Sequence, residues 1–216
     1  MHSIAKEDLP ALFEALRDVF VVQREALIAL DGKVGDSDLG ITMSKAFVAA
    51  FESVRNNATD PIGKTVQLAG MAVAKAAPST MGTLVATGLM RGGKALEGVQ
   101  TWGTAEMSAF WDAFLKGVAD RGKAQLGDKT LLDVLSPIAL SLQAAKASSA
   151  AMGTALAQAA QAARDGLEAT KAMVAQHGKA ACFQEKTIGL QDAGATVGVL
   201  IIETMYIFVV NYRRST

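Results

Sequence analysis

The sequence has few of the residues that build disulfides, zinc sites or nucleophilic triads. Cys182 is the single cysteine, which excludes an internal disulfide and a zinc site made from several cysteines. The two histidines, His2 and His177, are too few and too far apart in sequence for the paired ligands of a zinc motif. Ser79 has no evident histidine partner, so the sequence does not support a Ser-His-Asp arrangement.

The sequence also lacks an excess of positive or negative charge, and it lacks a long apolar run. The formal net charge is zero, so no basic field predicts a nucleic acid or an anionic membrane surface as partner. The N-terminus lacks the basic-then-apolar pattern of a signal peptide. The most apolar run, residues 197–210, is shorter than a membrane span and contains Glu203. We therefore expect a cytoplasmic enzyme or enzyme subunit that is not embedded in a membrane.

What the sequence does contain is helical periodicity. Half of the 216 residues are hydrophobic and 19% are charged, as in a folded chain, and we expect one domain over residues 1–216. Apolar residues recur every three or four positions, and signals for strands are sparse. The pattern predicts an all-α, eight-helix antiparallel up-down bundle or barrel, with Thr80 capping the fourth helix. The expected helices span residues 9–31, 41–54, 61–77, 80–96, 104–121, 129–143, 152–176 and 194–211.

Antiparallel helices place alternate loops at the same end of a bundle. Four of the expected loops therefore share one end, and they are also the loops richest in Gly, Asp, Thr and Lys: residues 31–40, 78–83, 122–128 and 177–194. Backbone N–H groups at the starts of helices favour phosphate, so this end is expected to hold the chemistry. The other reading is that Gly and Asp are simply ordinary loop residues.

The first of these loops holds three carboxylates, Asp31, Asp36 and Asp38, separated by glycines. Two carboxylates about 5 Å apart repel by roughly 3 kcal/mol at an effective dielectric near 20. A cation relieves that repulsion, and Mg²⁺ is the first choice because it takes one or two carboxylates together with phosphate oxygens. The same residues also fit an acidic turn whose aspartates cap helices and face water. The spacing alone leaves both interpretations open.

Two other ligand motifs are excluded by spacing. Gly92-Gly93-Lys94 lacks the glycine spacing of a Walker phosphate loop. Asp36 and Asp38 match the start of a calcium loop, but the acid that closes such a loop is missing, because Phe47 stands at the twelfth position.

Four stretches of the chain, in order, match the motifs of one known family. They are Leu30-Asp31 with Gly35-Asp36-Ser37-Asp38-Leu39-Gly40; Gly82-Thr83-Leu84 with Ala86-Thr87; Arg121-Gly122-Lys123-Ala124 with Gly127-Asp128-Lys129-Thr130 and Asp133; and Gly178-Lys179-Ala180 with Glu185-Lys186-Thr187-Ile188-Gly189 and Gln191-Asp192-Ala193-Gly194-Ala195-Thr196. Nearly the whole chain resembles the nucleotide-binding L subunit of dihydroxyacetone kinase, which is also the C-terminal domain of single-chain versions.

This resemblance implies an eight-helix barrel that binds ADP or ATP at one end through two Mg²⁺ ions. It implies that Asp31, Asp36 and Asp38 are the metal ligands and the catalytic residues. The remaining implied nucleotide contacts fall into three groups: Leu39, Gly40, Ile41, Thr42, Met81 and Gly82 at the phosphates; Gly122 and Leu131 at the adenine; and Lys179, Asp192, Ala193 and Gly194 closing over the nucleotide.

Three positions depart from the pattern of the family's bacterial subunits. Leu39 and Leu190 stand where those subunits have histidine, and Met81 stands where they have serine. Each change removes a polar group near the expected phosphates. The aspartate triad is intact, so nucleotide binding is expected, while the sequence leaves open the phosphoryl donor, the hydroxyketone and the transfer rate.

The resemblance therefore implies the nucleotide-binding subunit of a dihydroxyacetone-type kinase, a phosphotransferase that is active only with a partner. The implied partner is a K-type subunit that holds the small hydroxyketone through a histidine. The phosphoryl donor is either free ATP or a phosphohistidine protein, an M subunit of a phosphotransferase system, which recharges bound ADP. A homodimer is a further arrangement that the sequence leaves open. The alternative function is an ADP-binding regulatory or scaffold protein without turnover.

Overall fold

A computed structural model describes residues 3–211, so His2 and the two ends of the expected domain lie outside the described residues. Residues of high helix propensity dominate, and most described residues are helical. The α-helices are α1 (Leu9–Val22), α2 (Arg24–Asp31), α3 (Leu39–Asn56), α4 (Ile62–Ala76), α5 (Thr80–Ala95), α6 (Thr104–Gly122), α7 (Leu132–Ala147), α8 (Met152–Ala169) and α9 (Ala193–Asn211). Short elements are the strands β1 (Ile4–Ala5) and β2 (Thr101–Trp102) and the 3₁₀ segments η1 (Lys6–Asp8), η2 (Thr170–Ala172) and η3 (Lys179–Thr187).

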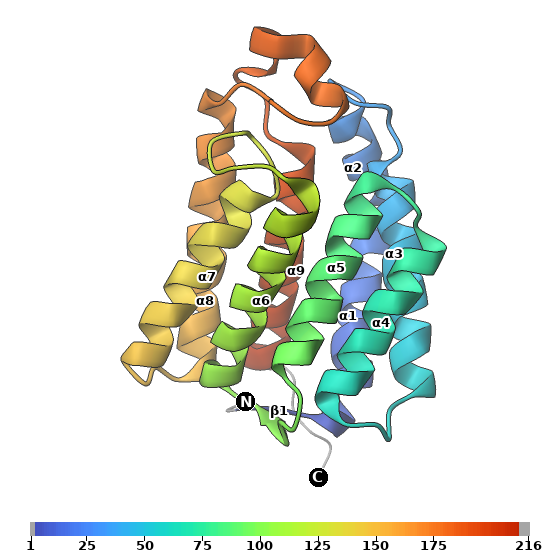
Figure 1. The fold of residues 1–216 in the computed structure, drawn as a ribbon, viewed down its shortest axis with the longest axis vertical. Helices are drawn as coiled ribbons and strands as arrows, with labels where there is room; N and C mark the ends of the chain where they lie inside the picture. Colours follow the sequence, from blue (N-terminus) through green and yellow to red (C-terminus); the bar gives the residue numbers. More distant parts are fainter. Residues whose placement is uncertain (1–2, 212–216) are drawn as a thin grey trace.

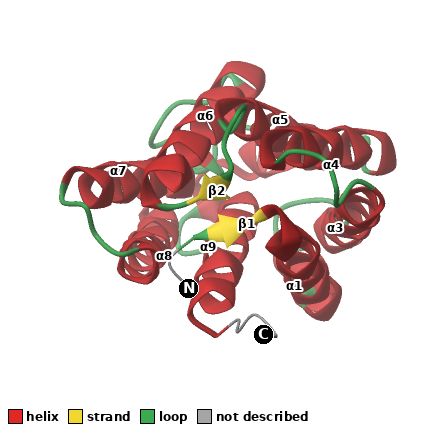
Figure 2. Cartoon of the chain, turned by 90° about the horizontal axis from the view of Figure 1, so that it is seen from below, coloured by secondary structure: helices red, strands yellow, loops and turns green. Residues whose placement is uncertain are grey.

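The helices form a closed ring of antiparallel neighbours (Figures 1 and 2). Each long helix packs on the next along the chain, from α3 to α9, and α1 packs on both α3 and α9 and so closes the ring. With α1 and α2 counted as one interrupted rod, this is the eight-helix, all-α barrel that the periodicity predicts.

The first predicted helix is continuous through residue 31, and this is wrong. The chain leaves helical geometry at Gln23, where ψ is 2°, and α2 then starts at Arg24. The Gln23 N–H still bonds the Val19 carbonyl at 2.8 Å, so the break is a single-residue kink and the apolar stripe continues across it.

Apolar and aromatic side chains fill the barrel. The rings of Phe20 and Phe47 stack at 4.2 Å between centroids, and Trp102 packs on Phe110 at 4.9 Å. Burying one such side chain contributes about 1.5–3 kcal/mol, so this interior dominates the stabilisation of the ring. At the end opposite the candidate site, β1 pairs antiparallel with β2, with Ile4 facing Trp102. Figure 2 shows this two-stranded pair lying across that end of the barrel.

Helix α9 is a core element of the barrel. By length and composition alone it is apolar enough to cross a membrane, and it is the one described helix of which this is true. However, it packs against α8, α1 and α7. Its one acid, Glu203, pairs with Arg164 on α8 at 2.7 Å. Its apolar composition is therefore matched by neighbours that cover most of it.

Other differences from the predicted helix limits gather at the site end. Helix α8 ends at Ala169 instead of near residue 176, and η3 lies in the segment predicted to be a loop. The cap of α5 is Ser79 instead of Thr80, because the Ser79 hydroxyl accepts from the Gly82 N–H at 3.0 Å. The segment after α8 is held by tertiary contacts, among them the bonds of the Thr170 and Leu190 carbonyls to Lys129, whereas the Ser79 cap is a local bond that helical periodicity does not reveal.

Candidate functional site

A cavity of about 650 Å³ lies at the end of the barrel where the four predicted loops meet. Its lining comes from α2 and the loop after it, the start of α5, the end of α6 with the following loop, and the segment before α9. Alternate loops therefore do share one end, as the antiparallel helix count predicts. A segment that we call the cover (residues 170–190, orange in Figure 1) lies across this end and reaches from α8 toward α2.

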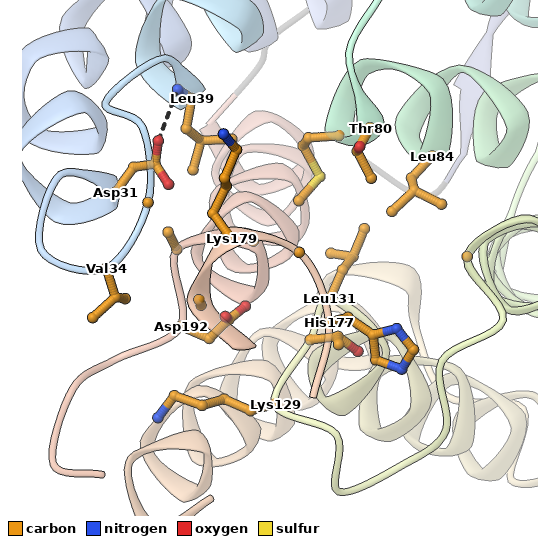
Figure 3. A pocket seen from close by; sticks show the side chains of 18 of the residues that line it. Asp31, Val34, Leu39, Thr80, Leu84, Lys129, Leu131, His177, Lys179 and Asp192 are labelled. Carbon is orange, nitrogen blue, oxygen red and sulfur yellow. Dashed lines mark hydrogen bonds between the residues drawn. The ribbon is translucent and has the colours of Figure 1, made fainter. Parts of the chain in front are cut away.

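The three aspartates come together at one side of the cavity. Asp31, Asp36 and Asp38 each offer a carboxylate oxygen, and these oxygens all lie within 4.8 Å of one another. Asp31 is oriented by the protein, because its Oδ2 accepts from the Asp38 N–H at 3.1 Å and from the Leu39 N–H at 3.4 Å. Figure 3 shows the second of these bonds. The donor set is three hard carboxylate oxygens facing a cavity, which fits a divalent cation such as Mg²⁺.

Two glycines allow the loop to bring these carboxylates close. A Cβ on Gly35 would lie 2.2 Å from Asp31 Oδ1, so any side chain there would displace the carboxylate. A Cβ on Gly40 would lie 2.0 Å from the Arg24 carbonyl, so α3 can approach α2 only with glycine at this position. Ser37, between two of the acids, has a φ of +61°, in the left-handed region.

Burial and the neighbouring carboxylates both act on the pKa of Asp38. Burial, together with the charges of Asp36 and Asp31, raises the pKa of Asp38 above its usual range, and Lys179 opposes this shift. The Lys179 ammonium reaches across from the cover to 3.6 Å from Asp36 Oδ2. The Lys179 side chain is 71% exposed and the Asp36 side chain is 50% exposed. Because both are exposed to solvent, this ion pair compensates the acidic charge only weakly.

The rest of the cavity is largely apolar. Leu84, Val118 and Leu131 line it opposite the triad, and Figure 3 shows Leu84 and Leu131 across the space from Asp31. Met81 also lines the cavity. Its Cε packs against Gly194, because a Cβ on Gly194 would lie only 2.7 Å from it. The cavity therefore joins a carboxylate cluster at one side to an apolar wall suited to a flat, weakly polar group.

Most of the sequence-predicted site residues line the cavity. They are Asp31, Asp36, Asp38, Leu39, Met81, Gly122, Leu131, Lys179, Asp192, Ala193 and Gly194. The others, Gly40, Ile41, Thr42 and Gly82, lie behind this layer in the first turns of α3 and α5. A Cβ on Gly82 would be 2.0 Å from the Ala77 carbonyl, which shows that this position packs against the preceding turn.

Comparison with known proteins decides the family. The DAK2 domain matches residues 33–207. The chain belongs to the DAK2 domain family. This DAK2 domain is 30% identical over 188 residues to the ADP-binding subunit DhaL of the PEP-dependent dihydroxyacetone kinase of Escherichia coli strain K12, covering 87% of this chain and 90% of that subunit.

Longer kinases match this DAK2 domain over only part of their length. It is 31% identical over 203 residues to the L-erythrulose 1-kinase of Mycolicibacterium smegmatis, which covers 92% of this chain and 35% of that kinase. It superposes with a TM-score of 0.70 on the crystal structure of the dihydroxyacetone kinase from C. freundii in complex with AMP-PNP and Mg²⁺, at 24% identity, covering 91% of this chain and 33% of that one. The superposition shows a shared fold.

The structure of the DAK2 domain also shows site residues to which the sequence assigned no role. His177 lines the cavity, and its Nε2 lies 2.9 Å from Asp128 Oδ2, which joins the cover to the loop before α7. Asp133 accepts from the N–H groups of Gly127 at 2.6 Å and Thr130 at 2.7 Å, and so shapes that loop. Asp128, Lys129 and Asp133 belong to a matched motif, which was the available signal, but spacing alone does not reveal what their side chains contact.

Asp192 lies near the middle of the cavity lining (Figure 3). Its Oδ2 accepts from the Ala195 N–H at 2.6 Å at the start of α9, so it caps that helix. Burial raises the pKa of Asp192 to about 6, against the opposing effects of the Ala195 hydrogen bond and the nearby Lys129 charge. A carboxyl that titrates near neutrality therefore lines the cavity of the DAK2 domain.

Proposed function

We propose that this DAK2 domain is the nucleotide-binding subunit of a dihydroxyacetone-type kinase, which binds ADP or ATP with two Mg²⁺ ions and serves phosphoryl transfer to a small hydroxyketone. The observation that carries the proposal is the group of three carboxylates within 4.8 Å beside a 650 Å³ cavity with an apolar wall. Support comes from the relatives, whose names include an ADP-binding kinase subunit and an L-erythrulose 1-kinase.

In this proposal each part of the cavity has one task. Asp31, Asp36 and Asp38 hold the metal, which when bound neutralises the charge on the phosphate oxygens. The start of α5, capped by Ser79, offers backbone N–H groups toward the phosphates. Leu84 and Leu131 contact the base. These residues bind and orient the nucleotide, so catalysis rests on positioning and electrostatics.

The hydroxyketone is held by a separate K-type subunit. In the family that the sequence resembles, a histidine of the K-type subunit holds the ketose covalently, and His177, the one histidine among residues 3–211, is instead paired with Asp128. We propose that the phosphoryl donor is free ATP or a phosphohistidine protein that recharges bound ADP. A phosphoprotein donor is supported by the names of two relatives, which are called PEP-dependent and PTS-dependent dihydroxyacetone kinase subunits.

A second candidate function is an ADP-binding regulatory or scaffold protein without turnover. Leu39 and Met81 favour it, because both line the cavity and both are apolar at its phosphate side. Fewer polar groups there would leave nucleotide binding to the triad and weaken the stabilisation of a transferring phosphoryl group.

Calorimetry with ADP tests the binding step. We expect binding in Mg²⁺ and little or none in EDTA, because the triad contacts phosphate only through the metal. Equal affinity in both buffers would disprove the role given to Asp31, Asp36 and Asp38. Steady-state assays with a cognate K-type subunit, with ATP or with a phosphohistidine donor, then separate the candidates. Turnover supports the kinase subunit, and binding without turnover in both assays supports the regulator.

A further inference from the structure

The loop before α7 carries a buried lysine that contacts neither the cavity's carboxylate triad nor any described carboxylate at hydrogen-bond distance. Lys129 is 3% exposed and has a φ of +60°, so its backbone is in the left-handed region. Burial lowers the pKa of Lys129, and the charge of Asp192 opposes that shift. A lysine in this backbone geometry and at this burial is uncommon, because both features cost free energy unless contacts offset them.

Four backbone carbonyls offset that cost. Lys129 Nζ donates to Thr170 O at 2.6 Å, Leu190 O at 2.6 Å and Thr187 O at 2.9 Å, and lies 3.3 Å from Met173 O. An ammonium has three protons, so the three short bonds use all of them and the fourth carbonyl shares one. Two of the carbonyls lie where the cover begins and two where it ends. One cation therefore joins both ends of the cover to the loop before α7.

Other hydrogen bonds at the base of the cover each join two points, among them Ala175 N–H to Thr187 Oγ1 at 3.0 Å and Asp192 N–H to Thr170 Oγ1 at 3.2 Å. The Gly189 N–H donates to Lys171 O at 2.7 Å, and the Gln176 N–H donates to Asp128 O at 3.1 Å. Without the ammonium, four carbonyls converge on one place with no donor between them, and they repel one another. These pairwise bonds do not supply the missing positive charge, so the lysine has no substitute at this position.

We propose that Lys129 is a positioning residue that fastens both ends of the cover over the cavity and thereby sets how long bound nucleotide is retained. The proposal rests on the proposed function for its nucleotide. The connection to the site is direct, because the middle of the cover lines the cavity and brings Lys179 to 3.6 Å from Asp36. Lys129 also belongs to the cavity lining, and Figure 3 shows it below Asp192 and away from Asp31.

Nucleotide release gives the first test. We expect Lys129→Met to speed the dissociation of a fluorescent ADP analogue in Mg²⁺, with a much smaller change in association. If the closed cover is populated only a tenth of the time in the variant, the apparent affinity falls about tenfold. Lys171→Met is the matched control, because Lys171 is also at the base of the cover but its side chain makes an exposed ion pair with Glu168, and its backbone carbonyl is unchanged by the substitution. Release at the wild-type rate from Lys129→Met would overturn the proposal.

Hydrogen exchange on the nucleotide-free protein gives a second test that does not depend on the proposed function. We expect Lys129→Met to raise exchange within residues 171–190 and to leave α3, α4 and α5 at wild-type protection. Equal loss of protection throughout the barrel, or none in the cover, would show that Lys129 has no specific hold on it. If wild-type protein binds no Mg·ADP while this pattern appears, the proposed function fails and the fastening role stands.

Chemical rescue distinguishes the loss of the ammonium group from general damage to the fold by the substitution. Lys129→Ala removes three carbons and the ammonium, which are the atoms of a propylammonium ion. We expect added propylammonium chloride to restore protection in residues 171–190 of this variant. Tetramethylammonium chloride at equal concentration has the charge but no N–H donor, and it should not restore protection. Equal rescue by both salts, or by neither, would contradict a role based on hydrogen bonding to the four carbonyls.

Discussion

Asp36→Asn is the substitution that tests the metal assignment most directly. Asp31 is a poor choice, because its carboxylate also accepts two backbone N–H groups and holds the start of α3. The described contact of the Asp36 side chain is its ion pair with Lys179 at 3.6 Å. Asparagine keeps the size and hydrogen-bonding capacity of the side chain while it removes one negative charge, so the variant separates charge from structure.

The expected effect on the metal-free protein follows from the carboxylate spacing. At 4.8 Å two charges repel by about 3 kcal/mol at an effective dielectric of 20 and by about 1 kcal/mol in water. Asp36 and Asp38 are exposed, so the lower figure applies to each pair. The lost ion pair with Lys179 is exposed as well and contributes about 0–1 kcal/mol. Asp36 belongs to two such pairs, so its neutralisation relieves about 2 kcal/mol of repulsion and gives up about 0–1 kcal/mol of ion pairing. Asp36→Asn should therefore raise the free energy of unfolding by about 1–2 kcal/mol.

The effect on the loaded protein is opposite. Three carboxylates carry three negative charges, ADP adds about three, and two Mg²⁺ ions offset four. A hundredfold excess of Mg·ADP over its dissociation constant should stabilise the wild type by about 2.7 kcal/mol. For a chain of this length that corresponds to a rise in Tm of roughly 5–10 °C. Asp36→Asn should lose most of that rise, because one of three ligands to the metal is gone.

The assay is a pair of thermal melts on each protein, with and without Mg·ADP. Asp60→Asn is the matched control, because Asp60 also pairs with a lysine, Lys64 at 3.1 Å, and does not line the cavity. This control should keep the full nucleotide shift. If Asp36→Asn lowers the apo Tm markedly and keeps the Mg·ADP shift, Asp36 is a structural cap and the metal assignment is wrong.

Two further predictions concern activity and pH. The purified chain should give no turnover on free dihydroxyacetone with ATP, because in the proposed function a K-type partner holds the ketose; steady ATP-dependent phosphorylation by the chain alone would refute this. Burial raises the pKa of Asp192 from 3.8 to about 6, so the folded protein favours the protonated carboxyl. The stability that this protonated carboxyl contributes is therefore present below about pH 4 and is lost as the pH rises through about 6. In urea unfolding, the free energy of unfolding of Asp192→Asn should rise relative to that of the wild type as the pH goes from 4 to 7. An equal difference between the two proteins at pH 4 and at pH 7 would contradict the raised pKa of Asp192.

Much of the fold could be predicted from helical periodicity. The stripes of apolar residues gave the number of rods, and the number of antiparallel rods placed the four polar loops at one end. Helix limits were less certain where tertiary contacts replace the helical pattern. Helix α8 stops at Ala169, and the carbonyls of Thr170 and Met173 beyond it contact Lys129; no local pattern in residues 170–176 indicates that end.

The candidate site was predictable to the extent that its chemistry lies in one short stretch. The triad spans eight residues, so its spacing already implied proximity, and Gly35 shows why glycine stands inside it. Lys129 lies at the other extreme. Its partners are 41 to 61 residues away along the chain, and all are backbone carbonyls, which every residue type provides.

The helical class, the end of the barrel where the polar loops meet and the closeness of the three aspartates follow from the sequence alone, because periodicity and short-range spacing are local properties. Only the tertiary structure decided the kink at Gln23, the 3₁₀ cover across the cavity and the carbonyl cage of Lys129. The cover and the cage depend on backbone groups from distant segments meeting in space. Every residue type has the same backbone carbonyl, so the sequence does not show which carbonyls will come together. The closed ring of helices brings them into contact.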